Sequence, residues 1–372
     1  CERMNNLKYV TYQSFPANTA NSIQTISNIV HLVKNQTSVD LYFPLRENQS
    51  SDNLIELQKF YNFEDSFNIT GIEHRYPHGR VKYFKKISYH LSHYLWAKQV
   101  VNKYFKNNNN DVFLTRSDWI AYFLAKQGSS VTFECHQTSK LRNFIINQII
   151  GKMDNVKFIF LNENLKSFYN NIDNSIVLHN GVDTNLFKDD HDSKVSNSIV
   201  FMGNVTRFDK SRGLDQILNW FCDEEIKKIF TLDIIGAGQN SIKKLEEKID
   251  RLNLSNVVNI SGRLSRRKAI LSMRKYSIGL LINSPDNPHS YLYTSPIKYF
   301  EYLYGGLKIL AVDFPSHRSL PFSENISFFH NGDFKSFKNA LFYCNTIKPI
   351  GKENLNTITL DYRAKEIIKF LF

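Results

Sequence analysis

The chain has 372 residues, of which 42% are hydrophobic and 22% are charged, and its formal net charge is +12 at pH 7. This length is enough for two domains, each with its own hydrophobic core. The excess of Lys and Arg favours an anionic partner: a nucleotide, a phospholipid surface or a nucleic acid. Four scattered cysteines without a CxxC pair predict neither a zinc site nor a disulfide framework, and no apolar run approaches the ~18 residues of a membrane span. We therefore expect a cytoplasmic protein.

The first elements read as strand, loop, helix and strand. Short apolar runs predict strands at residues 7–12 and 38–43, the second stopped by Pro44, and apolar residues at helical spacing predict a helix from about residue 21. In such a βαβ unit the first loop leaves the carboxyl end of a strand, where ligands bind in open α/β sheets. Asn18 and Asn21 could donate hydrogen bonds to an acceptor substrate, but we prefer to interpret them as a turn residue and a helix cap.

Residues 75–106 are rich in bases and aromatic side chains, and residues 87–105 within them predict an amphipathic helix. This segment suits docking on an anionic membrane surface or contact with nucleic acid phosphates. A core-facing helix with a solvated basic face explains it equally well. Because no recognised nucleic-acid motif accompanies the charge, we do not expect nucleic acid as a partner.

The alternation of strands and helices continues through the first half of the chain. Further strands are predicted at residues 111–115, 130–135, 157–161 and 175–178, with a helix at 118–126. His136 follows one of these strands directly, at a carboxyl end, which makes it a candidate for contact with substrate.

A domain boundary is predicted near Gly181, where a glycine turn precedes a polar, charged run through residue 196. We expect domains at residues 4–180 and 181–356, followed by a terminal segment at 357–372. A second α/β series follows the boundary. Its strands are predicted at residues 198–203, 231–238, 257–263, 277–283 and 307–312, and two of its helices at 214–221 and 241–252.

A helix is predicted from Ser295 to Gly306, with Ser295 as its cap, Pro296 in its first position and a glycine pair at its end. Lys298 and Glu301 share one narrow polar edge of this mostly apolar helix. They indicate either an anion site with a hydroxyl acceptor beside it or a salt-bridged pair on an ordinary amphipathic helix.

Glycine turns end several strands of the second series, and in a parallel sheet such turns line one crevice. These glycines are Gly203, Gly236, Gly238 and Gly262, and the candidate cations around them are Arg207, Lys210, Arg212 and Lys298. Together they predict a phosphate- and nucleotide-sized site, which favours the anion-site interpretation of Lys298 and Glu301.

The ordered motifs resemble those of family 4 glycosyltransferases. They are Asn180-Gly181-Val182-Asp183, the loop from Gly203 to Arg212-Gly213, Ile235-Gly236-Ala237-Gly238, Ser261-Gly262-Arg263 and Ser295-Pro296 followed by Lys298 and Glu301. The resemblance implies an α/β protein of the GT-B fold, in which two Rossmann-like domains with parallel sheets face a central cleft. It also implies a UDP- or GDP-sugar donor on the second domain, a hydroxyl acceptor on the first, and a terminal helix that returns to the first domain.

By resemblance, the donor diphosphate lies near Gly203, Arg212 and Lys298, the ribose at Glu301 and the base near Gly262-Arg263, while His136 contacts the transferred sugar. Two positions depart from the family pattern. Asn204 stands where many members have a basic residue, so that Arg207 or Lys210 would replace it, and Tyr293 stands where the first glutamate of a paired-glutamate motif is usual. Our candidate catalytic residues are His136, Arg212 and Lys298, and our candidate donor-binding residues are Gly203, Asn204, Arg207, Lys210, Gly236, Gly238, Gly262, Arg263, Ser295, Pro296 and Glu301.

The resemblance further implies a retaining transferase without metal or cofactor, in which fixed cations stabilise the leaving diphosphate. We expect a role in bacterial-type surface polysaccharide or glycolipid synthesis, with the protein in the cytoplasm or peripheral on the inner face of the membrane. The alternatives are a nucleotide-sugar epimerase of the same GT-B architecture and a non-catalytic module that binds sugar or membrane.

Overall fold

The computed structural model describes residues 5–78, 84–106, 111–188, 193–207 and 210–372. The chain divides into two compact units, one made of Cys1–Leu178 with Leu360–Phe372 and the other of His179–Thr359. The first division lies two residues before the expected position, and the segment that returns to the first unit begins at Leu360 instead of residue 357. Among the helices of the described residues, none is both long and apolar enough to span a membrane.

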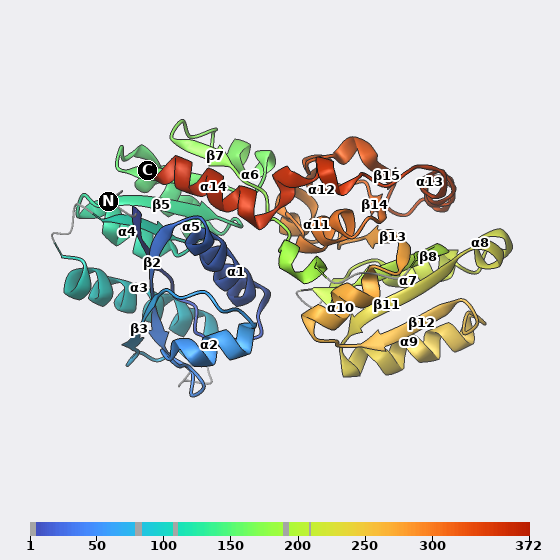
Figure 1. Cartoon of the computed structure of the whole chain (residues 1–372), viewed down its shortest axis with the longest axis horizontal. Helices are drawn as coiled ribbons and strands as arrows, with labels where there is room; N and C mark the ends of the chain where they lie inside the picture. Colours follow the sequence, from blue (N-terminus) through green and yellow to red (C-terminus); the bar gives the residue numbers. More distant parts are fainter. Residues whose placement is uncertain (1–4, 79–83, 107–110, 189–192, 208–209) are drawn as a thin grey trace. The chain divides into compact units, whose positions relative to one another are not determined.

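The first unit is built on a seven-stranded parallel sheet in the order β3-β2-β1-β4-β5-β6-β7 (Figure 1). Its strands are β1 Asn5–Val10, β2 Thr37–Leu45, β3 Asn68–Glu73, β4 Val112–Thr115, β5 Ser130–Cys135, β6 Val156–Phe160 and β7 Ser175–Val177. The strand order reverses between β1 and β4, so the carboxyl ends of these two strands flank the place where open α/β sheets bind ligands.

The helices of this unit are α1 Ala20–Lys34, α2 Leu54–Tyr61, α3 Lys85–Tyr104, α4 Asp118–Lys126, α5 Lys140–Gln148, α6 Glu163–Phe168 and α14 Leu360–Leu371. The last helix contributes Ala364, Ile367 and Leu371 to the same core as Leu7 and Ile26. Its backbone is also held from the sheet, because Lys157 Nζ on β6 donates to the carbonyl oxygen of Phe370 at 2.7 Å. Helix α14 is therefore an integral part of the first core.

Two expectations for the first unit are corrected, and one strand was not expected. Helix α1 is capped by Thr19, whose hydroxyl accepts from the backbone N–H of Ser22, so Asn21 lies in the first turn and is not the cap. Strand β2 is not stopped at Pro44, which pairs with Ile72 near the carboxyl end of the strand, where one missing N–H costs little. Strand β3 was not predicted because it is a sheet edge with little burial, which leaves it without a strong apolar pattern.

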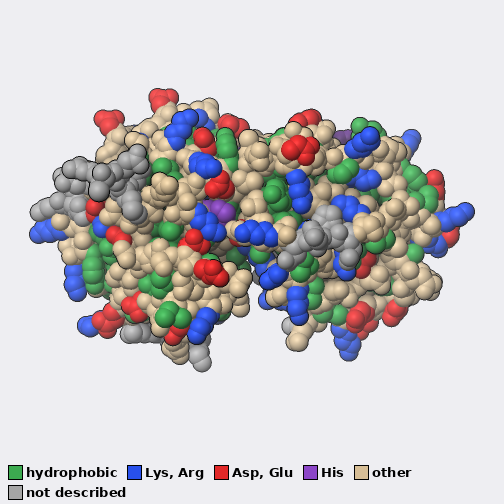
Figure 2. All heavy atoms as spheres, in the orientation of Figure 1, with side chains coloured by type: hydrophobic (Ala, Val, Ile, Leu, Met, Phe, Trp, Pro, Cys, Tyr) green, Lys and Arg blue, Asp and Glu red, His purple; other side chains and the backbone are tan. Residues whose placement is uncertain are grey.

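The second unit has a six-stranded parallel sheet in the order β12-β11-β8-β13-β14-β15. These strands are β8 Val195–Met202, β11 Thr231–Ala237, β12 Val258–Gly262, β13 Tyr276–Leu281, β14 Lys308–Val312 and β15 Ile326–Phe329, and a small hairpin joins β9 Thr206–Arg207 to β10 Lys210–Ser211. The helices are α7 Leu214–Trp220, α8 Glu224–Ile229, α9 Gln239–Arg251, α10 Arg266–Met273, α11 Ile297–Tyr304, α12 Pro315–Arg318 and α13 Phe334–Thr346. In the face shown in Figure 2, Lys and Arg side chains lie over both units, interspersed with Asp and Glu.

Helix α11 is fixed by the aromatic ring of Tyr302. The ring lies against Gly279 on β13, where a Cβ atom would come within 2.4 Å of Tyr302 Cδ2, so only glycine fits there. The hydroxyl of Tyr302 accepts the backbone N–H of Met202 at 2.8 Å, at the end of β8. The helix ends at a glycine pair as predicted, with Gly306 at a φ of 71°.

Ser295 does not cap helix α11. Pro296 occupies the cap position without a side-chain hydrogen bond, and the Ser295 hydroxyl accepts the backbone N–H of Asn180 at 3.1 Å. The side-chain amide of Asn180 in turn donates to the Ser295 carbonyl oxygen at 2.5 Å. These two buried bonds join the first residues of the second unit to the start of α11.

We expect Ser295→Ala to lower the free energy of unfolding by about 1–3 kcal/mol, because it removes the hydroxyl that accepts a buried N–H. The measurement is chemical denaturation of the purified protein. Ser265→Ala is the matched control, since Ser265 is exposed and makes no capping bond at the start of α10. Equal stabilities of the two variants would contradict a structural role for the Ser295–Asn180 pair.

Candidate functional site

Two glycine turns at the carboxyl edge of the second sheet are in backbone contact. Gly203 follows β8 with a φ of 127°, and Gly236 near the end of β11 has a φ of 99°, both in the region that favours glycine. A Cβ atom on Gly236 would lie 3.4 Å from the backbone N, Cα and O of Gly203. The sequence predicted these glycines, and the structure brings them together because the Gly203 N–H also donates to the Ile235 carbonyl at 2.8 Å.

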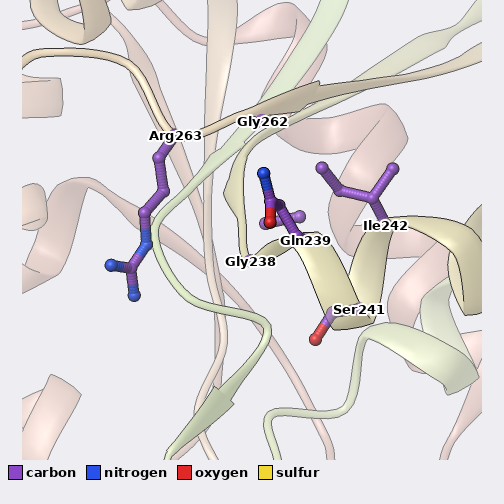
Figure 3. Close-up of a pocket in the computed structure, with 7 residues that line it drawn as sticks. Gly238, Gln239, Ser241, Ile242, Gly262 and Arg263 are labelled. Carbon is purple, nitrogen blue, oxygen red and sulfur yellow. The ribbon is translucent and has the colours of Figure 1, made fainter.

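A cavity of about 700 Å³ opens beside these turns (Figure 3). It is lined by Ala237, Gly238, Gln239, Ser241, Ile242, Gly262 and Arg263. The 13-residue helix α9 begins at this cavity with Gly238 in the cap position, where no side chain occupies the first backbone N–H groups. Figure 3 shows the Arg263 guanidinium on one side of the pocket and the apolar Ile242 on the other. A pocket of this size with an apolar wall and a few polar groups suits a nucleoside.

Arg263 reaches the loop after β8. Its guanidinium donates to Asn204 Oδ1 at 3.3 Å, and both side chains are exposed. The structure thus places a cation beside Asn204, from the end of β12, which is separated from β8 by β11 in the sheet. Arg207 and Lys210 were the residues expected to replace the basic residue that is usual at position 204. Only their backbone is described, in the β9–β10 hairpin.

Arg212 lies close to the Gly203 turn. One nitrogen of its guanidinium is 4.0 Å from the position that a Cβ atom would take on Gly203. The next residue, Gly213, has a φ of 88° and starts α7, so the chain turns sharply after Arg212. A cation and a glycine turn that were nine residues apart in sequence therefore meet at one sheet edge.

The two polar residues of α11 have different surroundings. Glu301 is only 5% exposed, and its Oε1 accepts from Arg266 on α10 at 3.1 Å. Lys298 Nζ lies over the ring of Phe201, 4.2 Å from its centroid. Arg266 was not selected from the sequence, because nothing in the spacing of the basic run at 263–268 distinguishes the residue that faces Glu301.

His317 is a further buried group beside Lys298. Its Nδ1 donates to the Val312 carbonyl at 2.8 Å, which places a proton on Nδ1. Burial, together with the nearby Lys298 charge, lowers the pKa of His317 to about 4, so the ring is neutral at neutral pH. His317 therefore adds no positive charge beside Lys298 at neutral pH.

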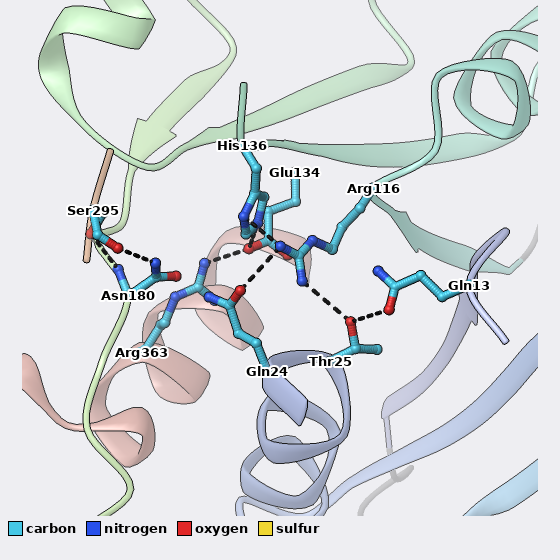
Figure 4. Close-up of polar contacts among 9 residues, drawn as sticks. All are labelled: Gln13, Gln24, Thr25, Arg116, Glu134, His136, Asn180, Ser295 and Arg363. Carbon is cyan, nitrogen blue, oxygen red and sulfur yellow. Dashed lines mark hydrogen bonds and ion pairs between the residues drawn. The ribbon is translucent and has the colours of Figure 1, made fainter. Parts of the chain in front are cut away.

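In the first unit, His136 follows β5 and both of its ring nitrogens are engaged (Figure 4). Nε2 donates to Glu134 Oε1 at 2.7 Å, and the Arg116 guanidinium donates to Nδ1. Burial, followed by repulsion from Arg116, lowers the pKa of His136 to about 3. Asn18 and Asn21, the other candidates in this unit, are exposed at the amino end of α1. The structure therefore does not join them to His136 in one polar cluster.

No protein-family model and no curated protein matches the chain. Among solved structures, a sucrose-phosphate synthase from Thermosynechococcus elongatus matches with a TM-score of 0.66 at 13% identity, covering 99% of this chain and 95% of the other. The lipopolysaccharide outer core galactosyltransferase WaaB matches with a TM-score of 0.65 at 12% identity, over 98% and 99%. The Anabaena protein HepE in complex with UDP matches with a TM-score of 0.59 at 13% identity, over 99% and 95%. At such identities the likeness shows the fold, which is the GT-B fold of two Rossmann-like units that the sequence motifs predicted.

Proposed function

We propose that this protein is a retaining glycosyltransferase of the family 4 type, which moves a sugar from a nucleotide-sugar donor to a hydroxyl acceptor. The observation that carries the proposal is the convergence at the carboxyl edge of the second sheet. There the Gly203–Gly236 contact, the cavity at Gly238 and Gly262, and the cation Arg212 lie together. Parallel α/β sheets bind nucleotides at this edge.

The donor fits this site in three parts. The base takes the cavity beside Arg263, and the diphosphate takes the Gly203 turn, where glycine lets the backbone approach phosphate oxygens closely. The ribose hydroxyls take Glu301, a buried carboxylate that Arg266 holds in place. The HepE structures contain UDP and UDP-glucose, which supports a UDP-sugar as the donor.

In the transfer step the acceptor oxygen bonds to the anomeric carbon on the same face from which the diphosphate leaves. The bond from that carbon to the phosphate oxygen breaks, and the acceptor proton passes to the departing phosphate. The principal demand on the protein is to stabilise the negative charge on the leaving group, for which Arg212 and Lys298 are the candidate fixed cations. His136 is suited to contact the sugar and not to remove a proton, since both of its nitrogens are engaged.

We further propose a cytoplasmic role in surface polysaccharide or glycolipid synthesis, with transfer of a hexose. WaaB is a lipopolysaccharide galactosyltransferase, and the WaaG structure is described as a glycosyltransferase involved in lipopolysaccharide biosynthesis, which supports such an acceptor. One surface of the first unit adds to this support. Phe84, Ile87 and Leu91 share one face at the start of α3 and are 79%, 66% and 49% exposed, with exposed Lys85 and Lys86 beside them. This arrangement suits peripheral docking on an anionic membrane.

Nucleotide binding tests the proposed donor site. We expect calorimetry with UDP, GDP and ADP to detect binding of at least one nucleotide, and Glu301→Gln to weaken that binding about tenfold, the effect of losing one hydrogen-bonded charge at about 1.4 kcal/mol. Glu246→Gln, an exposed position on α9, is the charge-matched control. Absence of binding to every nucleotide favours the non-catalytic module, and unchanged affinity in Glu301→Gln removes Glu301 from the ribose site.

Incubation with a nucleotide sugar alone, followed by analysis for an epimer, separates an epimerase from a transferase.

We expect Lys298→Ala to slow sugar transfer by on the order of 10²–10³-fold, because it removes one preorganised charge that stabilises the leaving diphosphate. The rate is measured by release of the nucleoside diphosphate from the donor identified above. Lys335→Ala is the control, since Lys335 is exposed on α13. Near-normal turnover of a folded Lys298→Ala protein would remove Lys298 from the site.

Membrane docking predicts that the protein sediments with vesicles containing phosphatidylglycerol and not with vesicles of phosphatidylcholine alone. Replacement of Ile87 and Leu91 by Ser is expected to reduce the bound fraction several-fold, because apolar burial and anionic attraction act together at such a surface. Replacement of Ile55, which is 60% exposed on α2, by Ser is the control. Protein that stays in solution with anionic vesicles would overturn the docking proposal and leave the transferase proposal standing.

A further inference from the structure

Four charged or titratable residues, two of them buried and two half-buried, form a chain of contacts in the first unit. Arg116 follows β4, Glu134 lies on β5, His136 follows β5, and Arg363 lies on α14 (Figure 4). Arg363 donates to Glu134 Oε1 at 2.7 Å, the same oxygen that accepts from His136 Nε2 at 2.7 Å. Arg116 donates to the opposite nitrogen of the imidazole, Nδ1. The contacts therefore run from Arg363 through Glu134 and His136 to Arg116.

These contacts define the tautomer of His136. A guanidinium has only donors, so Nδ1 must accept from Arg116 and the proton of the neutral ring must be on Nε2. That N–H points to the carboxylate of Glu134, which is 1% exposed. The same arrangement, in which a carboxylate orients an imidazole, is used in metal and catalytic sites to select one tautomer.

The carboxylate of Glu134 depends on Arg363. Burial alone would raise the pKa of Glu134, but the charges of Arg363 and Arg116, together with the hydrogen bond that neutral His136 donates, hold it well below its ordinary range. Arg363 is 3% exposed, and Glu134 Oε2 has no hydrogen-bond partner among the described residues, so Oε1 carries the contacts. Without Arg363, the negative charge of the buried Glu134 carboxylate would be offset much less by positive charge.

Three further described residues beside this cluster are neutral. Tyr9 on β1 is fully buried, and burial raises its pKa to about 12, so it is neutral. Helix α1 contributes Gln24 and Thr25, whose oxygens accept from Arg116 at 3.1 and 3.2 Å. Arg116 thus meets three neutral acceptors, and these fix its guanidinium at the carboxyl ends of β4 and β5.

We propose that Arg363 is a positioning residue, which through Glu134 holds His136 in one orientation and one tautomer and thereby holds Arg116 at the ligand-binding edge of the first sheet. The proposal rests on the proposed function, because it takes this edge as part of a transferase site. It assigns His136 the role of a neutral link between two charged groups, and it gives helix α14 a part in the site besides its part in the core.

The test is nitrogen NMR of the full chain with labelled histidine, in which His136 is assigned from the spectrum of His136→Gln. In the unmodified protein we expect one neutral tautomer with the proton on Nε2 between about pH 5 and pH 8. In Arg363→Met the buried Glu134–His136 pair loses a cation and takes up a proton more readily. We therefore expect the pH midpoint at which the Glu134–His136 pair takes up a proton to rise by about one pH unit or more.

Three further variants keep the proposal open to refutation. Lys365→Met is the matched control on α14, because Lys365 is an exposed residue paired with Asp361, and it is expected to leave His136 unchanged. Arg363→Lys retains the charge and is expected to restore most of the unmodified titration. If Arg363→Met does not fold, Arg116→Met, at a half-buried position, is expected to raise the midpoint and release the tautomer. A folded Arg363→Met or Arg116→Met protein with an unchanged His136 signal would overturn the proposal.

A second readout separates this proposal from the proposed function. In a transferase assay we expect Arg363→Met to lower kcat about tenfold or more, a typical loss for an outer-shell partner, and to leave nucleotide affinity in the second unit unchanged. A protein without any transferase activity would contradict the proposed function, while the NMR result would still decide whether Arg363 positions His136. A normal kcat together with a shifted His136 titration would show that the positioning has no role in transfer and would overturn that part of the proposal.

Discussion

The contact of Tyr302 with Gly279 is the constraint on which the second unit's site depends. Because the ring lies directly on a strand backbone, α11 cannot move toward or away from β13 without a clash or a void. The hydroxyl of the same side chain holds the backbone N–H of Met202, one residue before Gly203. One residue therefore fixes the distance between the helix that carries Lys298 and Glu301 and the turn that is proposed to hold phosphate.

Local patterns in the sequence predicted five strands of the second sheet and three helices, α7, α9 and α11, and their limits have a physical origin. Strands such as β8 and β11 were visible because each contains a buried apolar run and is followed by a glycine. The glycine turns were visible because a positive φ leaves a specific residue type in the sequence. Ser295 was misassigned as a cap, since a hydroxyl before a helix can serve either its own backbone or a distant partner, and here Asn180 is that partner.

The long-range polar pairs could not be read from the chain. Arg363 and Glu134 are 229 positions apart, and Arg266 meets Glu301 across 35. No periodicity connects such residues, because their contact arises only when separate elements pack.

The surroundings of the arginine side chains differ between the two units. In the first, a carboxylate offsets part of the arginine charge within the cluster, whereas in the second Arg212 and Arg263 lie beside the glycine turns of the proposed anion site.

The return of α14 to the first core has a consequence for synthesis of the protein. A ribosome makes residues 1–178 first, and domains commonly begin to fold in that order. Yet Ala364, Ile367 and Leu371 fill part of that core, and Arg363 compensates Glu134 inside it. The first unit to be translated is thus the last to be completed. Until the second unit has been made, the apolar residues of the first core lack the side chains of α14, and such exposed apolar surface makes a nascent chain prone to aggregation.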